Sequence, residues 1–143
     1  MSTLEILLAE KSCRDLVVAA AAAVDGQDYE GLVQLFSADA TLTRPDGTLL
    51  VGRKAIFEAY ASRSSDRLTQ HLICNHVVHL TAPDQAKSHC KILLWSGQRS
   101  SILTGKGRLA DPQEQVGEMA DQLVLLPEGW RIQSRQARFT FYK

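Results

Sequence analysis

Three of the four histidines of this chain lie in one short stretch, "RLTQHLICNHVVHL" (residues 67–80), which otherwise has the β-branched and apolar residues of a buried strand. Imidazole can pack in a core, bind a metal ion or accept a proton near neutral pH. In a regular strand His71 and His79 share one face and lie roughly 26 Å apart, while His76 points to the other face. The spacing therefore predicts no metal site, and His76 and His79 are expected in structural or surface positions.

Asp25 is the second residue whose position in the sequence suggests chemistry. Asp25 follows Ala21 by four residues and Val17 by eight, so it extends the apolar stripe of a predicted first helix. A carboxylate there points inward, where an unpaired charge is costly. From the residues alone, Asp25 is either the buried partner of another group or a solvated carboxylate that caps the next turn. His71 is likewise either a hydrogen-bonded structural residue or a catalyst.

Hydrophobic periodicity and turn residues predict the elements that position these two side chains. Helices are expected over residues 3–25, where Gly26 ends the helix, then just after Asp28, and from Gly52 to about Ser62. Two short strands, "DATLTR" and "TLLV", are followed by two long hairpins. The hairpin strands are expected at residues 68–80 with 86–97, and at residues 118–126 with 130–142. Residues 99–115 are expected to be irregular.

Helices that come before a long antiparallel sheet indicate an α+β fold rather than a parallel α/β fold. A single curved sheet needs its inner face covered, and the three N-terminal helices can cover it. We therefore expect one domain, residues 1–143, built as a cone of curved antiparallel sheet around the helices. The cavity between helices and sheet is the expected ligand site.

Composition argues against several classes of partner. Hydrophobic residues make up 45% of the chain and charged residues 22%, which is typical of a globular domain, and 16 basic residues balance 16 acidic ones. We therefore expect no nucleic-acid partner and no membrane partner. The three cysteines lack zinc spacing, and no GxGxxG motif or signal peptide is recognisable. We expect a cytoplasmic protein without metal or cofactor.

Four segments together resemble one known family: "AAVDGQDYEGLVQLFSADATL", "GRKAIFEAY", "TQHLICNHVV" and "EGWRIQSRQARF". In order and spacing they are similar to the SnoaL-like branch of the nuclear transport factor 2-like superfamily. The resemblance covers about residues 5–142. It implies a cone of curved antiparallel sheet wrapped around helices, the same architecture that the pattern of elements predicts.

Within that superfamily the chain looks most like scytalone dehydratases and hexachlorocyclohexane dehydrochlorinases, which eliminate water or HCl. The resemblance implies that His71 in "TQH" is the base and that Asp25 in "VDGQD" orients it. Arg135, five residues after Trp130, matches the position that assists the leaving group. Four further residues are expected to bind the substrate: Val24, Tyr60, Ile73 and Met119.

Three positions depart from the pattern of those enzymes. Val24 stands where scytalone dehydratases have a tyrosine, and Ala20 stands where dehydrochlorinases can have a lysine. The stretch "GEMADQLVL" lacks the second histidine of the pocket. The base and its orienting carboxylate are kept, so the resemblance implies proton abstraction without fixing the reaction that follows.

Two functions from different classes are compatible with the sequence. The first is a small lyase or isomerase that abstracts a proton from an apolar, cyclic small molecule with the Asp25–His71 pair. The alternative is a binding or assembly subunit without chemistry, such as a ring-hydroxylating dioxygenase small subunit. In either case we expect a homodimer formed through an outer sheet face. Its apolar residues are expected to be Leu72, Cys74 and Val78, or Leu123 and Leu125.

Overall fold

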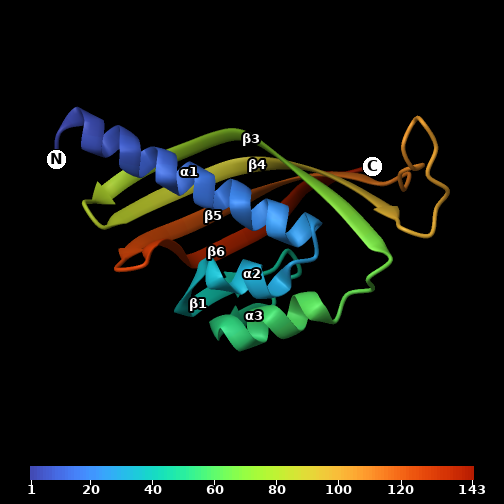
Figure 1. The fold of residues 1–143 in the computed structure, drawn as a ribbon, viewed down its shortest axis with the longest axis horizontal. Coiled ribbons are helices and arrows are strands. Elements are labelled where there is room, and N and C mark those ends of the chain that lie inside the picture. The colour runs from blue at the N-terminus through green and yellow to red at the C-terminus, as the bar shows by residue number, and fades with distance from the viewer.

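The computed structural model describes all residues, 1–143, as three helices and one six-stranded sheet (Figure 1). The helices are α1 (Thr3–Asp25), α2 (Tyr29–Gln34) and α3 (Gly52–Ala61). The strands are β1 (Phe36–Thr43), β2 (Leu49–Val51), β3 (Arg67–Ala82), β4 (Gln85–Gln98), β5 (Glu114–Leu126) and β6 (Gly129–Tyr142). α1 crosses the long strands, and α2 and α3 lie together beside β1 (Figure 1). The predicted α+β fold is confirmed.

The strand order in the sheet is β2-β1-β6-β5-β4-β3. β3 with β4 and β5 with β6 are the two predicted hairpins. β1 pairs with β6 in parallel, with Phe36 opposite Ile132. The expectation of a wholly antiparallel sheet is corrected at this pair, because no hairpin joins β1 to β6. β3 is left at one edge of the sheet.

A capping box begins α1. The Ser2 hydroxyl accepts a hydrogen bond from the Glu5 amide, and the Glu5 carboxylate accepts one from the Ser2 amide. The buried face of the helix has many small side chains, which let it lie close to the sheet: Cys13, Leu16, Val17, Ala20, Ala21 and Val24. At the C-terminal end of the helix, Gly26 has a right-handed helical backbone. The left-handed conformation often found at a glycine there is instead adopted by the next residue, Gln27, with a φ of 57°. The helix thus ends on Asp25, beside β3.

The core fills the space between the helices and the inner face of the sheet. The main cluster joins all three helices to the sheet and contains the fully buried Phe36, Ile56 and Ile132. A smaller cluster joins Val17 of α1 to β4 beneath the middle of the helix. None of the three helices is both long enough and apolar enough to cross a lipid bilayer.

A bulge in β3 reverses which side chains of the strand face the helices: odd-numbered residues face them before the bulge and even-numbered residues after it. The pairing with β4 shifts after Cys74, and Asn75 is left-handed with a φ of 49°. Beyond the bulge the even-numbered residues face the helices, so Val78 is buried and His76 lies on the same side of the sheet as His71. The expectations that His76 points away from the His71 face, and that Val78 lies on an outer face, are therefore wrong.

Leu123 also differs from the expected outer face. It is buried because the odd-numbered residues of β5 from Gly117 to Leu123 face the helices. Leu125 continues that series but lies at the end of the strand, where the helices no longer cover it, and is exposed. Leu72 and Cys74 are exposed as expected.

A second bulge, in β6, places Arg135 on the inner face. Ile132 is fully buried, and regular alternation would put a residue three positions later on the opposite face. The pairing with β5 shifts between Gln122 and Leu123, which adds one residue to β6. Arg135 is consequently buried on the side of the helices.

Candidate active site

Asp25 and His71 form a hydrogen-bonded pair that links the last residue of α1 to the inner face of β3. Asp25 Oδ1 lies 2.5 Å from His71 Nδ1 and accepts a hydrogen bond from the Thr69 hydroxyl at 2.8 Å. Asp25 Oδ2 accepts a hydrogen bond from the backbone amide of His71 at 2.9 Å. The Asp25 side chain is only 15% exposed. Three donors therefore fix the carboxylate in one orientation.

These hydrogen bonds keep Asp25 ionised in an unfavourable place. Burial raises the pKa of a carboxyl group, and the C-terminal end of a helix also disfavours a negative charge. Burial is the largest single influence on Asp25, but the bonds from the His71 ring, the His71 amide and Thr69 together lower its pKa below the ordinary value. Because an ionised carboxylate can only accept, His71 Nδ1 carries the proton between the two groups.

The second ring nitrogen of His71 is left for a ligand. His71 lines a cavity of about 430 Å³, and its Nε2 makes no hydrogen bond within the protein. With the proton of the neutral ring on Nδ1, Nε2 has a free lone pair. The arrangement can therefore accept a proton from a molecule bound in the cavity.

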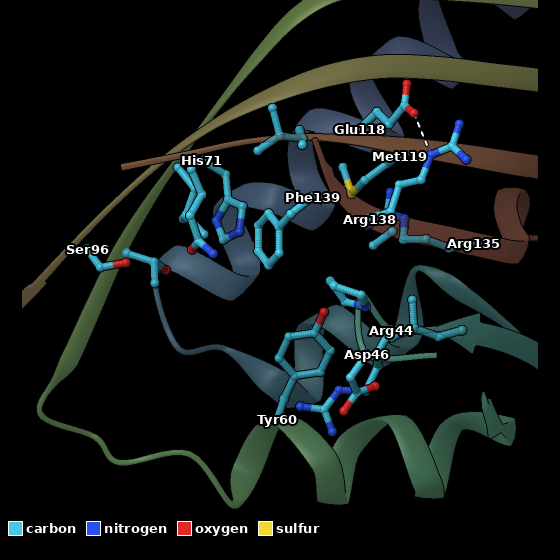
Figure 2. Close-up of a pocket in the computed structure, with 18 of the residues that line it drawn as sticks. Arg44, Asp46, Tyr60, His71, Ser96, Glu118, Met119, Arg135, Arg138 and Phe139 are labelled. Atoms are coloured by element: carbon cyan, nitrogen blue, oxygen red, sulfur yellow. Dashed lines mark hydrogen bonds and ion pairs between the residues drawn. The ribbon is translucent and has the colours of Figure 1, made fainter. Parts of the chain in front are cut away.

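The cavity lies between the long strands and the segment that contains α3. Phe139 and Met119 reach it from β6 and β5, and Tyr60 reaches it from α3 on the opposite side (Figure 2). Seven of its 22 lining residues are hydrophobic. The cavity is thus more polar than one built only for an apolar ligand.

Most of the predicted site residues meet at this cavity. His71, Arg135, Tyr60 and Met119 all line it. Asp25 lies behind His71 and contacts the imidazole rather than the cavity. The structure thus brings an imidazole, the carboxylate bound to it and a guanidinium into one region.

Val24 and Ile73 do not line the cavity, and these two expectations are corrected. Val24 is buried in the main core cluster. Successive residues of a helix point about 100° apart, so Val24 faces the core when Asp25 faces β3. Ile73 packs against the cluster that contains Val17 and Cys90. It lies one pleat further along β3 than His71, where α1 fills the space.

Arg135 is held by a carboxylate that sequence reasoning missed. Its Nε and Nη2 donate to Asp121 Oδ1 and Oδ2, both at 2.8 Å, and both side chains are almost fully buried. Burial favours the neutral form of Arg135, but Asp121 outweighs it and the pKa of Arg135 is raised. Nη1 makes no hydrogen bond within the protein. Arg135, which lines the cavity, is therefore held in one orientation with one nitrogen free of partners in the protein.

Most of the 22 lining residues were not predicted from the sequence, and three of these bear on the chemistry of the site: Thr69, Arg63 and Phe139. Thr69 could have been found, because it precedes His71 by two residues and a strand places such residues on one face. Phe139 depends on the β6 bulge for its inward position, so its spacing from Trp130 gives no signal. Arg63 follows the end of α3 and has no local motif.

His76 is the second histidine on the inner face, but it does not line the cavity. Its Nε2 lies 2.7 Å from the Ser88 hydroxyl. Burial lowers the pKa of His76, and the charge of Arg14 lowers it further. His76 is thus a neutral, hydrogen-bonded residue of the interior. No group of three or more His, Cys, Asp or Glu side chains is arranged to hold a metal ion.

Solved structures place the fold in the nuclear transport factor 2-like class, which has a cystatin-like fold. A nuclear transport factor 2-like protein from Novosphingobium aromaticivorans is 18% identical, with a TM-score of 0.75 over 95% of this chain and 84% of that one. A candidate scytalone dehydratase from the same species is 16% identical, with a TM-score of 0.82 over 99% and 91% of the two chains. A type 2 hexachlorocyclohexane dehydrochlorinase is 13% identical, with a TM-score of 0.82 over 99% and 92%.

Within this class, residues 5–136 match the family of the SnoaL-like domain. The chain belongs to the SnoaL-like family. No curated protein matches it. The resemblance seen in the sequence is therefore confirmed for the family and the fold. At sequence identities this low, the solved structures indicate the fold of this chain but not its activity.

Proposed function

We propose that this protein is a cofactor-independent lyase or isomerase that removes a proton from carbon in a cyclic small molecule. One observation carries the proposal. The His71 Nδ1 is held by a buried carboxylate, while Nε2 of the same ring is free at a cavity. A histidine that only supported the fold would use both nitrogens or be closed off from such a space.

The first step is the transfer of a proton from substrate carbon to His71 Nε2. Asp25 holds the ring in the required tautomer and stabilises the imidazolium that forms, because its negative charge lies 2.5 Å from Nδ1. The low exposure of the Asp25 side chain strengthens this pairing, because the charge is little screened by water. A positioned general base contributes on the order of 10²–10⁴-fold to the rate.

The electron pair left by the proton has two possible fates. In an elimination it becomes a carbon–carbon double bond while the bond from the adjacent carbon to the leaving group breaks. In an isomerisation it forms an enolate, and the imidazolium returns the proton to another carbon. Negative charge develops on the leaving group or on the enolate oxygen, and the free Nη1 of Arg135 is the donor that can stabilise it.

Proton exchange tests the dyad without knowledge of the natural substrate. The full chain is incubated in D₂O with cyclic ketones such as cyclohexanone and tetralone, and deuterium at the α-carbon is measured by NMR. Wild type is expected to exchange at least one ketone faster than buffer, and His71→Ala is expected to lose that acceleration. His79→Ala is the matched control, because His79 is an exposed histidine of the same strand.

The experiment has clear contrary outcomes. Exchange that persists in His71→Ala, with wild-type secondary structure by circular dichroism, would show that another group is the base. Exchange that is lost equally in His79→Ala would assign the effect to folding. Tight binding of ring compounds without any exchange would favour a binding protein of the same fold.

A further inference from the structure

Arginines are unusually frequent among the residues that line the cavity. Five of them line it, and two have carboxylate partners, since Arg135 binds Asp121 and Arg138 binds Glu118. The other three form neither an ion pair nor a side-chain hydrogen bond: Arg44 after β1, and Arg63 and Arg67 at the two ends of the connection between α3 and β3. Guanidinium groups that the protein leaves without acceptors are available to a ligand.

Arg63 is the most constrained of these three arginines. Its Cζ lies 4.5 Å from the centre of the Tyr60 ring, so a cation–π contact seats the guanidinium against that ring. Burial lowers the pKa of Arg63, and the charges of Arg67 and Arg44 lower it as well. An anion placed beside Arg63 would therefore remove a repulsion that exists in the free protein.

The balance of charges indicates what anion this is. Three carboxylates line the cavity, Asp46, Asp111 and Glu118. Two more stand directly behind lining residues, Asp121 behind Arg135 and Asp25 behind His71. Five arginines thus meet five carboxylates, so a ligand with a single negative charge disturbs this balance less than a dianionic phosphate does.

The arginines lie where a ligand could reach both them and the base. Arg44 and Asp46 lie beside Tyr60, across the cavity from His71 (Figure 2). The aromatic ring of Phe139 lies between these two sides (Figure 2). A ring held against Phe139 could therefore place one substituent at the arginines and a carbon–hydrogen bond at His71.

We infer that the substrate is a cyclic carboxylic acid, bound as its anion at Arg63 with its ring toward His71. This inference rests on the proposed function, because it names the substrate class of the same cavity. A guanidinium binds a carboxylate through two parallel hydrogen bonds, a geometry that lysine cannot match. The apolar lining residues would contact the ring, and the unpaired arginines would bind the carboxylate.

Calorimetric titration of the full chain with matched probes tests the inference. The probes are naphthoate, its neutral amide naphthamide, and naphthyl phosphate. Wild type is expected to bind naphthoate on the order of tenfold or more tightly than naphthamide, as a charge-assisted bidentate contact allows. Naphthoate affinity is expected to fall with added salt while naphthamide affinity does not. Naphthyl phosphate is expected to bind no more tightly than naphthoate.

Arg63→Gln identifies the arginine responsible, and Arg108→Gln is its control, because Arg108 is an exposed loop arginine away from the cavity. Arg63→Gln is expected to remove most of the preference for naphthoate over naphthamide, and Arg108→Gln to leave it intact. Equal affinity for acid and amide in wild type, or no detectable binding of either, would overturn the inference. Tighter binding of naphthyl phosphate would overturn the choice of a carboxylate. The wild-type measurements decide these points even if Arg63→Gln fails to fold.

The same titration in His71→Ala separates this inference from the proposed function. His71 does not take part in carboxylate binding here, so the preference for naphthoate is expected to survive in His71→Ala. A preserved preference with no proton exchange by wild type would contradict the proposed chemistry alone. Proton exchange by wild type without any preference for the acid would contradict the substrate class alone.

Discussion

Both carboxylate oxygens of Asp121 on β5 accept hydrogen bonds from the Arg135 guanidinium on the adjacent strand β6, each at a nitrogen–oxygen distance of 2.8 Å. The pair is buried on the inner face of the sheet, and it is the β6 bulge that turns Arg135 toward it. A guanidinium held at Nε and Nη2 has little freedom to rotate. Arg135 is therefore fixed at the cavity wall before any ligand arrives, with Nη1 free of partners in the protein, and such preorganisation reduces the rearrangement that binding requires.

Asp121→Asn is expected to destabilise the fold severely. The substitution leaves the Arg135 charge buried with no anionic partner, and breaking a buried pair costs about 3–5 kcal/mol. Urea unfolding followed by circular dichroism measures the loss. Glu118→Gln breaks the Glu118–Arg138 pair, which is more exposed, and is expected to change stability far less. Similar losses in the two variants would contradict a dominant role of burial.

Asp25 is expected to make folding sensitive to acid. Its pKa is lower in the folded protein than in the unfolded chain, so the unfolded chain binds the proton more readily. The stabilisation is complete above about pH 4, the ordinary value for aspartate, and is lost as the pH falls through the lowered pKa. The difference in free energy of unfolding between wild type and Asp25→Asn should shrink over that range. A difference that stays constant with pH would exclude this coupling.

His76 is expected to lower the stability of the fold at mildly acidic pH, because the folded protein favours its neutral form, whereas it favours the charged form of Asp25. Burial lowers its pKa, so the unfolded chain takes up the proton first as the pH falls. Stability should decline below about pH 6.5, the ordinary value for histidine, and continue to decline until the lowered pKa is passed. His76→Gln should flatten this part of the profile in thermal or urea unfolding. His79→Gln, at an exposed position of the same strand, should leave the decline in place.

Asn75 is expected to tolerate glycine but not a β-branched residue. Its φ of 49° lies in the left-handed region, which costs an ordinary L-residue roughly 1–2 kcal/mol. Asn75→Val should therefore lower the free energy of unfolding by about that amount, while Asn75→Gly should be close to neutral. Because Asn75 is exposed, lost packing does not complicate the comparison. Equal stability of the two variants would show that the bulge does not depend on this conformation.

Local patterns were sufficient for the elements, while the Asp25–His71 pair needed the family resemblance as well. The helical repeat places Asp25 on the buried side of α1, which short-range spacing in regular structure predicts directly. The choice of His71 over its neighbours came from the family motifs, because strand alternation left its role open. Thr69 follows from the same rule, since it shares the face of His71.

Features that depend on partners distant in sequence could not be predicted. Alternation in β3 puts His76 outside, and only the bulge at Asn75 reverses this, because a bulge is defined by pairing with another strand. Asp121 gives no local sign that it will meet Arg135, 14 residues later. Val24 was misplaced because its role was taken from the family resemblance and not from the direction of its own side chain on the helix.

The backbone contact of Asp25 has a consequence beyond chemistry. β3 is the last strand of the sheet, so amides on its outer side have no neighbouring strand, and the His71 amide is satisfied by the Asp25 carboxylate instead. An uncovered strand edge is a template for pairing with other chains. Asp25 therefore also removes one open donor from this edge, and a chain without it is expected to pair more readily with other chains there.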